Sequence, residues 1–127
     1  MKILIVEDNL ADVSYLQEAL EKTDGAKLAA SNCQTLAEAK ECIEKEDFDV
    51  VALDLGLPDC CGIETFIQIQ NCARDTPIVI LSDLYDESLA IEAVRLGAQD
   101  YLVKDLWNPH RISRSLAYGR ARSFMKN

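Results

Sequence analysis

No stretch of the sequence approaches the roughly 20 consecutive apolar residues that a membrane-spanning helix needs. The N-terminal segment MKILIVEDN has only four apolar residues in a row, 3–6, before two acidic residues, which is too few for the core of a signal peptide. We therefore expect a cytoplasmic protein that does not associate with a membrane.

The sequence also contains no CxxC pair. Its five cysteines are an odd number and include one adjacent pair, a spacing used neither by zinc sites nor by ordinary structural disulfides: Cys33, Cys42, Cys60, Cys61 and Cys72. Reduced thiols in a cytosolic protein are the simplest interpretation. No GxGxxG pattern follows the first apolar run, which excludes a dinucleotide-binding domain.

Basic residues are scarce over most of the chain, whose net charge is −9. Residues 1–103 hold 21 acidic and 7 basic side chains, whereas residues 104–127 hold 1 acidic and 6 basic ones. The acidic body argues against direct nucleic-acid binding. The basic end could contact an acidic partner, although a solvated helix face is the more ordinary explanation.

Five strand-like runs alternate with five helical patterns, and the runs lie at residues 2–6, 27–32, 50–53, 77–81 and 100–103. Thr35 with Glu38 predicts the start of the second helix. The fourth helix is predicted at residues 86–96 and should end at Gly97. Asn108 predicts the start of the last helix, at about 108–125. The predicted inward-facing helix residues are Leu10, Val13, Leu16 and Leu20, then Leu36, Ala39 and Ile43, then Ile63, Phe66 and Ile67, and finally Ile112 and Leu116.

The runs at 2–6, 50–53 and 77–81 are continuously apolar apart from Lys2, which is typical of central parallel strands covered on both faces. Alternation of strands with helices predicts a doubly wound α/β fold. Apolar residues make up 49% of the 127 residues, and no repeat or linker interrupts them, so we expect a single domain spanning 1–127. Ligands of such folds bind at the carboxyl ends of the strands.

Polar side chains stand at the ends of four of the five predicted strands: Glu7 and Asp8, Asp54, Ser82, and Lys104. Each has an ordinary explanation when taken alone; for example, Asp8 could cap the following helix. Together they predict a shared site, in which three carboxylates would repel one another unless a cation were present. Oxygen ligands without His or Cys favour Mg²⁺, Mn²⁺ or Ca²⁺.

The lysine and the hydroxyl have a role in this site if a phosphoryl group arrives. An ammonium pairs with phosphoryl oxygens, and a hydroxyl donates a hydrogen bond to them. One carboxylate would then be the nucleophile that forms an acyl phosphate.

These segments resemble the receiver domains of two-component response regulators, which have a five-stranded flavodoxin-like sheet of order 2-1-3-4-5. The matching motifs are ILIVEDN, VVALDLGLPDCCG, PIVILS and GAQDYLVK, and the resemblance extends from residue 1 to about residue 122. It implies that Asp54 is the phospho-acceptor and that Mg²⁺, or Mn²⁺ in its place, is bound by Asp8 directly, Glu7 mainly through water, Asp54 itself and the carbonyl of Gly56. It also implies that Ser82 and Lys104 contact the phosphoryl group and that Tyr101 is the switch aromatic.

The resemblance further implies a sensor histidine kinase or a phosphotransfer protein as the donor. The domain would catalyse only its own phosphorylation and dephosphorylation, so it would not be an enzyme acting on other substrates. Phosphorylation would change the surface of the fourth helix, fifth strand and fifth helix. That surface would control a protein effector or a fused output domain, or would form a homodimer.

Three features depart from the family pattern. Asp83 follows the predicted serine, where a small residue is common, and its charge should alter the lifetime of the phosphoryl group. Asp105 follows the predicted lysine, where a proline with a cis bond is common; a cis bond before a non-proline residue costs about 3–4 kcal/mol, which disfavours that geometry. Cys60 and Cys61 lie in the acceptor loop, and we interpret them as fillers of that loop.

Two alternatives use similar residues. A small aspartyl-nucleophile phosphatase of the haloacid-dehalogenase type would normally have DxDxT after the first strand, where this chain has VEDN. A receiver-fold interaction module that is not phosphorylated would lack the acceptor or the lysine, and both are present.

Overall fold

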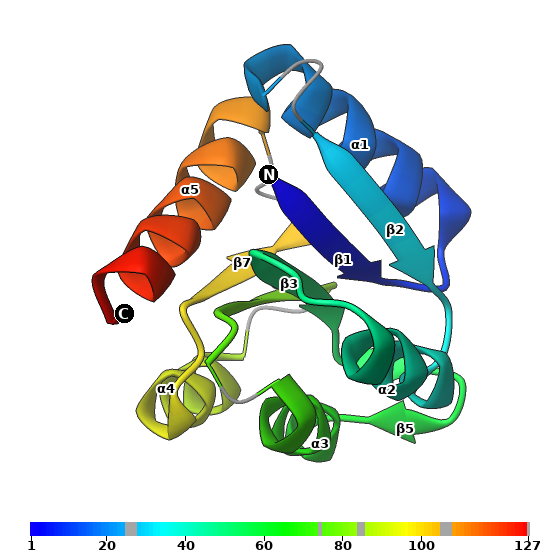
Figure 1. Ribbon diagram of the computed structural model, residues 1–127. Coiled ribbons are helices and arrows are strands. Elements are labelled where there is room, and N and C mark those ends of the chain that lie inside the picture. Colours follow the sequence, from blue (N-terminus) through cyan, green and yellow to red (C-terminus); the bar gives the residue numbers. More distant parts are fainter. Residues whose placement is uncertain (25–27, 74, 84–85, 105–107, 127) are drawn as a thin grey trace.

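Five parallel strands form one sheet in the order β2-β1-β3-β6-β7 in the computed structural model (Figure 1). They are β1 (Lys2–Val6), β2 (Ala29–Cys33), β3 (Val50–Asp54), β6 (Ile78–Ser82) and β7 (Asp100–Val103). The structure describes all residues except 25–27, 74, 84–85, 105–107 and 127, so the predicted start of the second strand at residue 27 lies outside the described residues. Because β6 and β7 are the fourth and fifth strands of this sheet, the predicted order 2-1-3-4-5 is confirmed.

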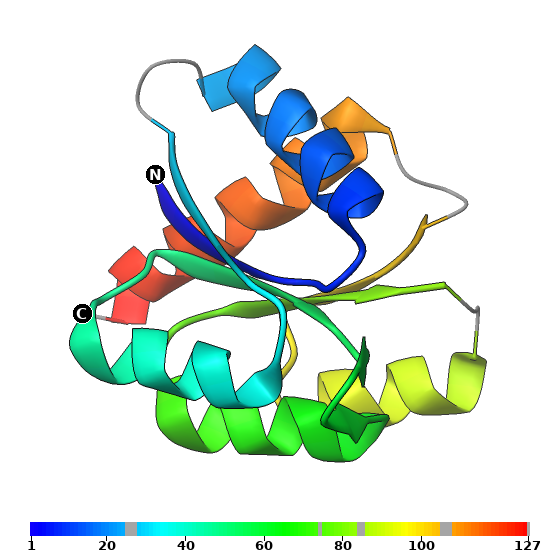
Figure 2. The same ribbon diagram turned by 90° about the vertical axis from the view of Figure 1, so that its right-hand side faces the viewer.

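Helices cover both faces of the sheet (Figure 2), which confirms the doubly wound α/β class. Helices α1 and α5 lie together on one face, and α2, α3 and α4 lie on the other. None of these helices, over the residues described, is long and apolar enough to cross a membrane. Their bounds are α1 (Leu10–Asp24), α2 (Leu36–Lys45), α3 (Ile63–Ala73), α4 (Glu87–Leu96) and α5 (Pro109–Lys126).

The central strands β1, β3 and β6 are apolar except at Lys2, Asp54 and Ser82, which lie at strand ends, because both faces of these strands are buried. In β1, Ile3 and Ile5 belong to the core layer beneath α1 and α5. Leu4 and Val6, which point the other way, belong to the layer beneath α2, α3 and α4. Each fully buried aliphatic side chain of this kind contributes about 1.5–3 kcal/mol relative to an exposed one. Two apolar layers therefore hold the sheet and fix the positions of the strand ends.

The predicted helix boundaries have the expected capping contacts. The Oγ1 of Thr35 accepts a hydrogen bond from the N–H of Glu38 at 3.1 Å, at the start of α2. The Oδ1 of Asn108 accepts one from the N–H of Arg111 at 2.9 Å, at the start of α5. Gly97 ends α4 with φ of 118°, a left-handed conformation that favours glycine.

Leu10 is a predicted core residue that the structure places in solvent. Its side chain is 61% exposed, whereas Val13, Leu16 and Leu20 are buried as predicted. The helical period continues back through Leu10, but the packed part of α1 begins one turn later, at Val13. The prediction for Leu10 was therefore wrong.

The acceptor loop, which follows Asp54 and ends at α3, contains a short antiparallel ribbon that the sequence pattern did not predict. Strand β4 (Gly56–Leu57) pairs with β5 (Cys60–Cys61), so the two adjacent cysteines lie in a short strand within this loop. The turn between them carries Asp59, whose carboxylate accepts hydrogen bonds from the N–H groups of Leu36 at 2.8 Å and Ala37 at 3.1 Å. The ribbon is thereby tied to the start of α2, where an acceptor is favourable.

Cys33 is expected to resist thiol reagents at neutral pH, whereas Cys61 and Cys72 should react. Burial, and then the contact of its Sγ with the Sγ of Cys42 at 3.1 Å, raise the pKa of Cys33 to about 12. Cys61 and Cys72 are exposed. Brief labelling of the folded protein with iodoacetamide, followed by peptide mass analysis, measures this difference. Labelling of Cys33 as fast as that of Cys61 would contradict it.

Candidate functional site

The carboxyl ends of the strands bring polar side chains to one edge of the sheet. Glu7 and Asp8 follow β1, and Lys104 follows β7. Asp54 is the last residue of β3 and Ser82 is the last residue of β6. Each strand therefore ends one residue later than predicted and includes the polar residue that was expected to follow it. The parallel register of β3, β6 and β7 aligns these ends with one another.

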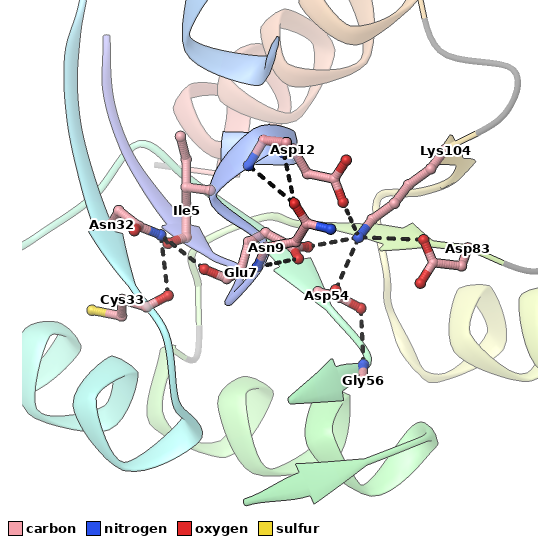
Figure 3. A network of polar contacts seen from close by, with 11 residues as sticks. Ile5, Glu7, Asn9, Asp12, Asn32, Cys33, Asp54, Gly56, Asp83 and Lys104 are labelled. Carbon is pink, nitrogen blue, oxygen red and sulfur yellow. Dashed lines mark hydrogen bonds and ion pairs between the residues drawn. The ribbon is translucent and has the colours of Figure 1, made fainter. Parts of the chain in front are cut away.

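Lys104 lies at the centre of this group (Figure 3). Its Nζ donates hydrogen bonds to Oε2 of Glu7 at 2.9 Å and to Oδ2 of Asp54 at 3.0 Å. A third bond goes to Oδ2 of Asp12 at 2.8 Å. The Lys104 side chain is only 8% exposed. Burial alone would lower its pKa, but these three carboxylates raise it, so the ammonium remains charged.

Asp12 is a site residue that the sequence analysis missed. It lies in the first turn of α1, where an acidic side chain is ordinarily explained by the helix dipole. The role of helix cap, considered for Asp8, belongs to Asn9, whose Oδ1 accepts hydrogen bonds from the N–H groups of Ala11 at 3.0 Å and Asp12 at 3.2 Å. The carboxylate of Asp8 is exposed at the edge of the site.

The carboxylate of Asp54 is buried and held at both oxygens. Its Oδ1 accepts a hydrogen bond from the N–H of Gly56 at 2.8 Å, and its Oδ2 accepts the bond from Lys104. Burial alone would raise the pKa of Asp54, but the hydrogen bonds from Glu7, Gly56 and Lys104 lower it below its usual value. Asp54 is therefore held as an anion, the form that a nucleophilic carboxylate needs.

Glu7 is the most deeply buried of the acidic residues in the site, at 1% exposure. Burial, and then its hydrogen bond with Asp54, raise its pKa to about 8. Its Oε1 accepts a hydrogen bond from the N–H of Asn9 at 3.0 Å. The backbone around it is supported by β2: Asn32 donates to the carbonyl of Glu7 at 3.2 Å, and the carbonyl of Cys33 accepts from the N–H of Glu7 at 2.9 Å. Asn32 is a supporting residue that the sequence analysis also missed.

Three of the carboxylates are close enough to share a cation. One oxygen each of Glu7, Asp8 and Asp54 lie within 4.8 Å of one another. Such hard oxygen ligands suit Mg²⁺, which binds proteins through one or two carboxylates and keeps several waters. The acidic cluster therefore fits the metal that the resemblance implied.

The remaining predicted residues lie around this group. Ser82 is half-buried at the end of β6, and Tyr101 is half-buried in β7, where it packs against the core layer beneath α2, α3 and α4. The Oδ1 of Asp83 is 3.6 Å from Nζ of Lys104, and the Asp83 side chain is 78% exposed. The peptide bond between Lys104 and Asp105 lies outside the described residues.

Known proteins share this sequence pattern and fold. A family model described as the response regulator receiver domain matches residues 3–117. The transcriptional regulatory protein YdfI of Bacillus subtilis is 34% identical over 106 residues, which cover 82% of this chain and 48% of YdfI. The transcriptional regulatory protein KdpE of Staphylococcus aureus is 38% identical over 103 residues, which cover 81% of this chain and 43% of KdpE. The matched part is less than half of either relative.

Solved structures agree with this match. The signal receiver domain of a putative Luxo repressor protein from Vibrio parahaemolyticus shares the fold with a TM-score of 0.87 at 24% identity, covering 98% of this chain and 93% of that one. A putative response regulator from Chloroflexus aurantiacus has a TM-score of 0.83 at 26% identity, covering 95% of this chain and 98% of that one. The chain therefore belongs to the response regulator receiver domain family, whose members are signalling modules of two-component systems.

Proposed function

We propose that this receiver domain accepts a phosphoryl group on Asp54. The placement of that carboxylate carries the proposal, because it is buried at the carboxyl edge of the sheet and held by Gly56 at 2.8 Å and Lys104 at 3.0 Å. A nucleophile fixed in this way loses little entropy on reaching the transition state. Phosphoryl transfer depends mainly on such positioning and on neutralisation of the phosphoryl oxygens.

In the proposed transfer, an oxygen of Asp54 forms a bond to phosphorus while the bond between phosphorus and the donor's leaving atom breaks. The product is an acyl phosphate. The donor would be a phosphohistidine on a sensor kinase or phosphotransfer protein, or a small donor such as acetyl phosphate. Lys104 would pair with a phosphoryl oxygen, and the hydroxyl of Ser82 would donate a hydrogen bond to another. Attack of water on the same phosphorus would break its bond to the Asp54 oxygen, which would release inorganic phosphate and return the free carboxylate.

Mg²⁺ would be held by the carboxylates of Asp8 and Asp54, by the carbonyl of Gly56, and by Glu7 mainly through water. When bound, the metal would supply positive charge to the phosphoryl oxygens. The cluster of three carboxylate oxygens within 4.8 Å supports this assignment. Mn²⁺ would be accepted by the same oxygen ligands.

The new charge on Asp54 would then change the surface formed by α4, β7 and α5. Ser82 would move toward the phosphoryl group, and Tyr101 would turn inward as space opens behind it. This surface would contact a protein effector or a fused output domain, or would form a homodimer. The names of YdfI and KdpE, transcriptional regulatory proteins, support an output of this kind for a longer protein. We further propose that residues 1–127 form one domain that acts in the cytoplasm.

Incubation with acetyl phosphate and Mg²⁺, followed by measurement of the intact mass, tests the proposed function. We expect the gain of one phosphoryl group, and no gain when a chelator removes Mg²⁺ before the donor is added. No gain from acetyl phosphate, other small donors or a phosphorylated kinase in the presence of Mg²⁺ would contradict the proposal. Continuous hydrolysis of p-nitrophenyl phosphate would instead support an aspartyl phosphatase.

Asp83→Ala is expected to slow the loss of the phosphoryl group. Asp83 is 3.6 Å from Lys104 and would compete with the phosphoryl oxygens for that ammonium. Because the Asp83 side chain is 78% exposed, the effect should be small, up to about fivefold, the factor that corresponds to a surface ion pair. The measurement is the decay of phosphorylated protein after removal of the donor. Equal decay in wild type and variant would dismiss a role for Asp83.

A further inference from the structure

Four carboxylates surround the ammonium of Lys104 among the residues that the structure describes, and Asp12 makes the shortest contact. Oδ2 of Asp12 accepts a hydrogen bond at 2.8 Å, compared with 2.9 Å for Glu7 and 3.0 Å for Asp54. Asp83, at 3.6 Å, is beyond hydrogen-bond distance. An ammonium has three donor hydrogens, so the three shorter contacts use all of them.

The contact from Asp12 joins two elements that are distant in the sequence. Asp12 belongs to the first turn of α1, and Lys104 follows β7, 92 residues later. Figure 3 shows Asp12 and Asp54 on opposite sides of the ammonium. Lysine carries its charge on a long flexible stem, so a fixed position for Nζ needs anchoring contacts. Asp12, itself only 26% exposed, supplies one of them.

The other two hydrogen-bond partners of Lys104 have further tasks in the proposed function. Glu7 and Asp54 belong, with Asp8, to the carboxylate cluster that fits a cation, and Asp12 is not part of that cluster. A cation at the cluster and a phosphoryl group on Asp54 would both draw on oxygens that Lys104 now uses. Asp12 is then the hydrogen-bond partner that Lys104 can keep when the cation is bound and when Asp54 carries the phosphoryl group.

We propose that Asp12 is a positioning residue that holds the ammonium of Lys104 beside Asp54 during phosphoryl transfer. This inference rests on the proposed function of Asp54. It gives a different expectation from simple charge repulsion, in which a carboxylate near the site would hinder the approach of an anionic donor. Removal of the hydrogen bond should slow transfer if Asp12 positions Lys104, whereas removal of the charge should speed transfer if repulsion dominates.

Three variants separate these effects in a time course of phosphorylation by acetyl phosphate and Mg²⁺, followed by intact mass. Asp12→Ala removes both the hydrogen-bond acceptor and the charge, and should slow transfer by about tenfold. This is well below the roughly 100-fold loss of rate that misplacement of a reacting group can cause. Asp12→Asn keeps an oxygen that can accept a hydrogen bond, and should slow transfer less. Glu18→Ala removes an exposed charge from the same helix and should leave the rate unchanged.

A second measurement on the metal-free protein reports on Lys104 without any phosphoryl transfer. In protein labelled with ¹⁵N-lysine, a well-held ammonium exchanges its protons slowly and gives an NMR signal, which Lys104→Met identifies by its loss. We expect this signal in wild type and Asp12→Asn but not in Asp12→Ala. Circular dichroism and thermal unfolding check that each variant is folded.

The outcomes are distinguishable. A wild-type protein that is never phosphorylated would overturn the proposed function and this inference with it. If wild type is phosphorylated and Asp12→Ala is equally fast, or if both Asp12 variants are faster than wild type, the inference alone is overturned. An unchanged Lys104 signal in Asp12→Ala would also overturn it.

Discussion

Replacement of Asp54 by asparagine is expected to abolish phosphorylation by acetyl phosphate and Mg²⁺. The amide has nearly the shape of the carboxylate and can still accept a hydrogen bond from the N–H of Gly56, which is 2.8 Å from Oδ1 in the wild type. It carries no negative charge, however, and is a poor nucleophile compared with an ionised carboxylate. The intact mass of Asp54→Asn should therefore show no added phosphoryl group when the wild type is fully converted.

A matched control is available at the opposite edge of the sheet. Asp47 is exposed and precedes β3, whereas Asp54 ends the same strand. Asp47→Asn makes the same chemical change and should be phosphorylated at the wild-type rate. Phosphorylation of Asp54→Asn at a rate close to that of the wild type would show that another side chain is the acceptor.

Replacement of Lys104 by methionine should have the largest effect on stability. The ammonium of Lys104 is 8% exposed and hydrogen-bonded to Glu7 and Asp54, whose side chains are 1% and 8% exposed. Removing one partner from a buried ionic group leaves the opposite charge uncompensated and typically costs about 3–5 kcal/mol. We expect the free energy of unfolding, measured with urea at pH 7.5 without divalent ions, to fall by about 3 kcal/mol.

The pH dependence of this loss provides an internal check. Without Lys104, the folded-state pKa of Asp54 should rise above its unfolded value, and that of Glu7, already raised to about 8 by burial, should rise further, because both buried carboxylates lose the neighbouring cation. Stability from such groups is present below the unfolded pKa and is lost as pH rises through the folded pKa. The difference between wild type and Lys104→Met should therefore shrink toward pH 5.

Lys2→Met is the control for Lys104→Met. Lys2 forms an ion pair with Glu46 in which the side chains are 42% and 45% exposed. A surface pair of this kind contributes about 1 kcal/mol or less, so Lys2→Met should change the free energy of unfolding far less. A Lys104→Met protein that unfolds at the same urea concentration as the wild type would contradict the buried-cluster account.

The fold could be predicted well because its strongest signals are long and redundant. Strands such as 50–53 are apolar on both faces, and that pattern requires helices on both sides of a parallel sheet. The ribbon of β4 and β5 could not be predicted in the same way, because strands of two residues are too short for any periodicity to appear. The prediction that Leu10 is buried failed for the opposite reason: the helical period is clear, but it extends beyond the packed part of α1.

The candidate site could be predicted only where residues follow a strand directly. The rule that ligands bind at the carboxyl ends of parallel strands selected Asp54 and Lys104, and the structure places their side chains 3.0 Å apart. Asp12 and Asn32 act through tertiary contacts from other elements, and neither occupies a position that this rule selects. A functional role for Asp12 was also hard to predict because acidic residues are common in the first turn of a helix.

The most direct test of the central proposal is to locate the phosphoryl group on the chain. After phosphorylation with acetyl phosphate and Mg²⁺, borohydride reduces an aspartyl phosphate to homoserine, and peptide mass spectrometry identifies the residue that has changed. We predict homoserine at position 54, and at no other acidic position of the phosphorylated protein. Homoserine at a different aspartate, or a phosphoryl group that resists borohydride because it is on a serine or histidine, would contradict the assignment of Asp54 as the acceptor.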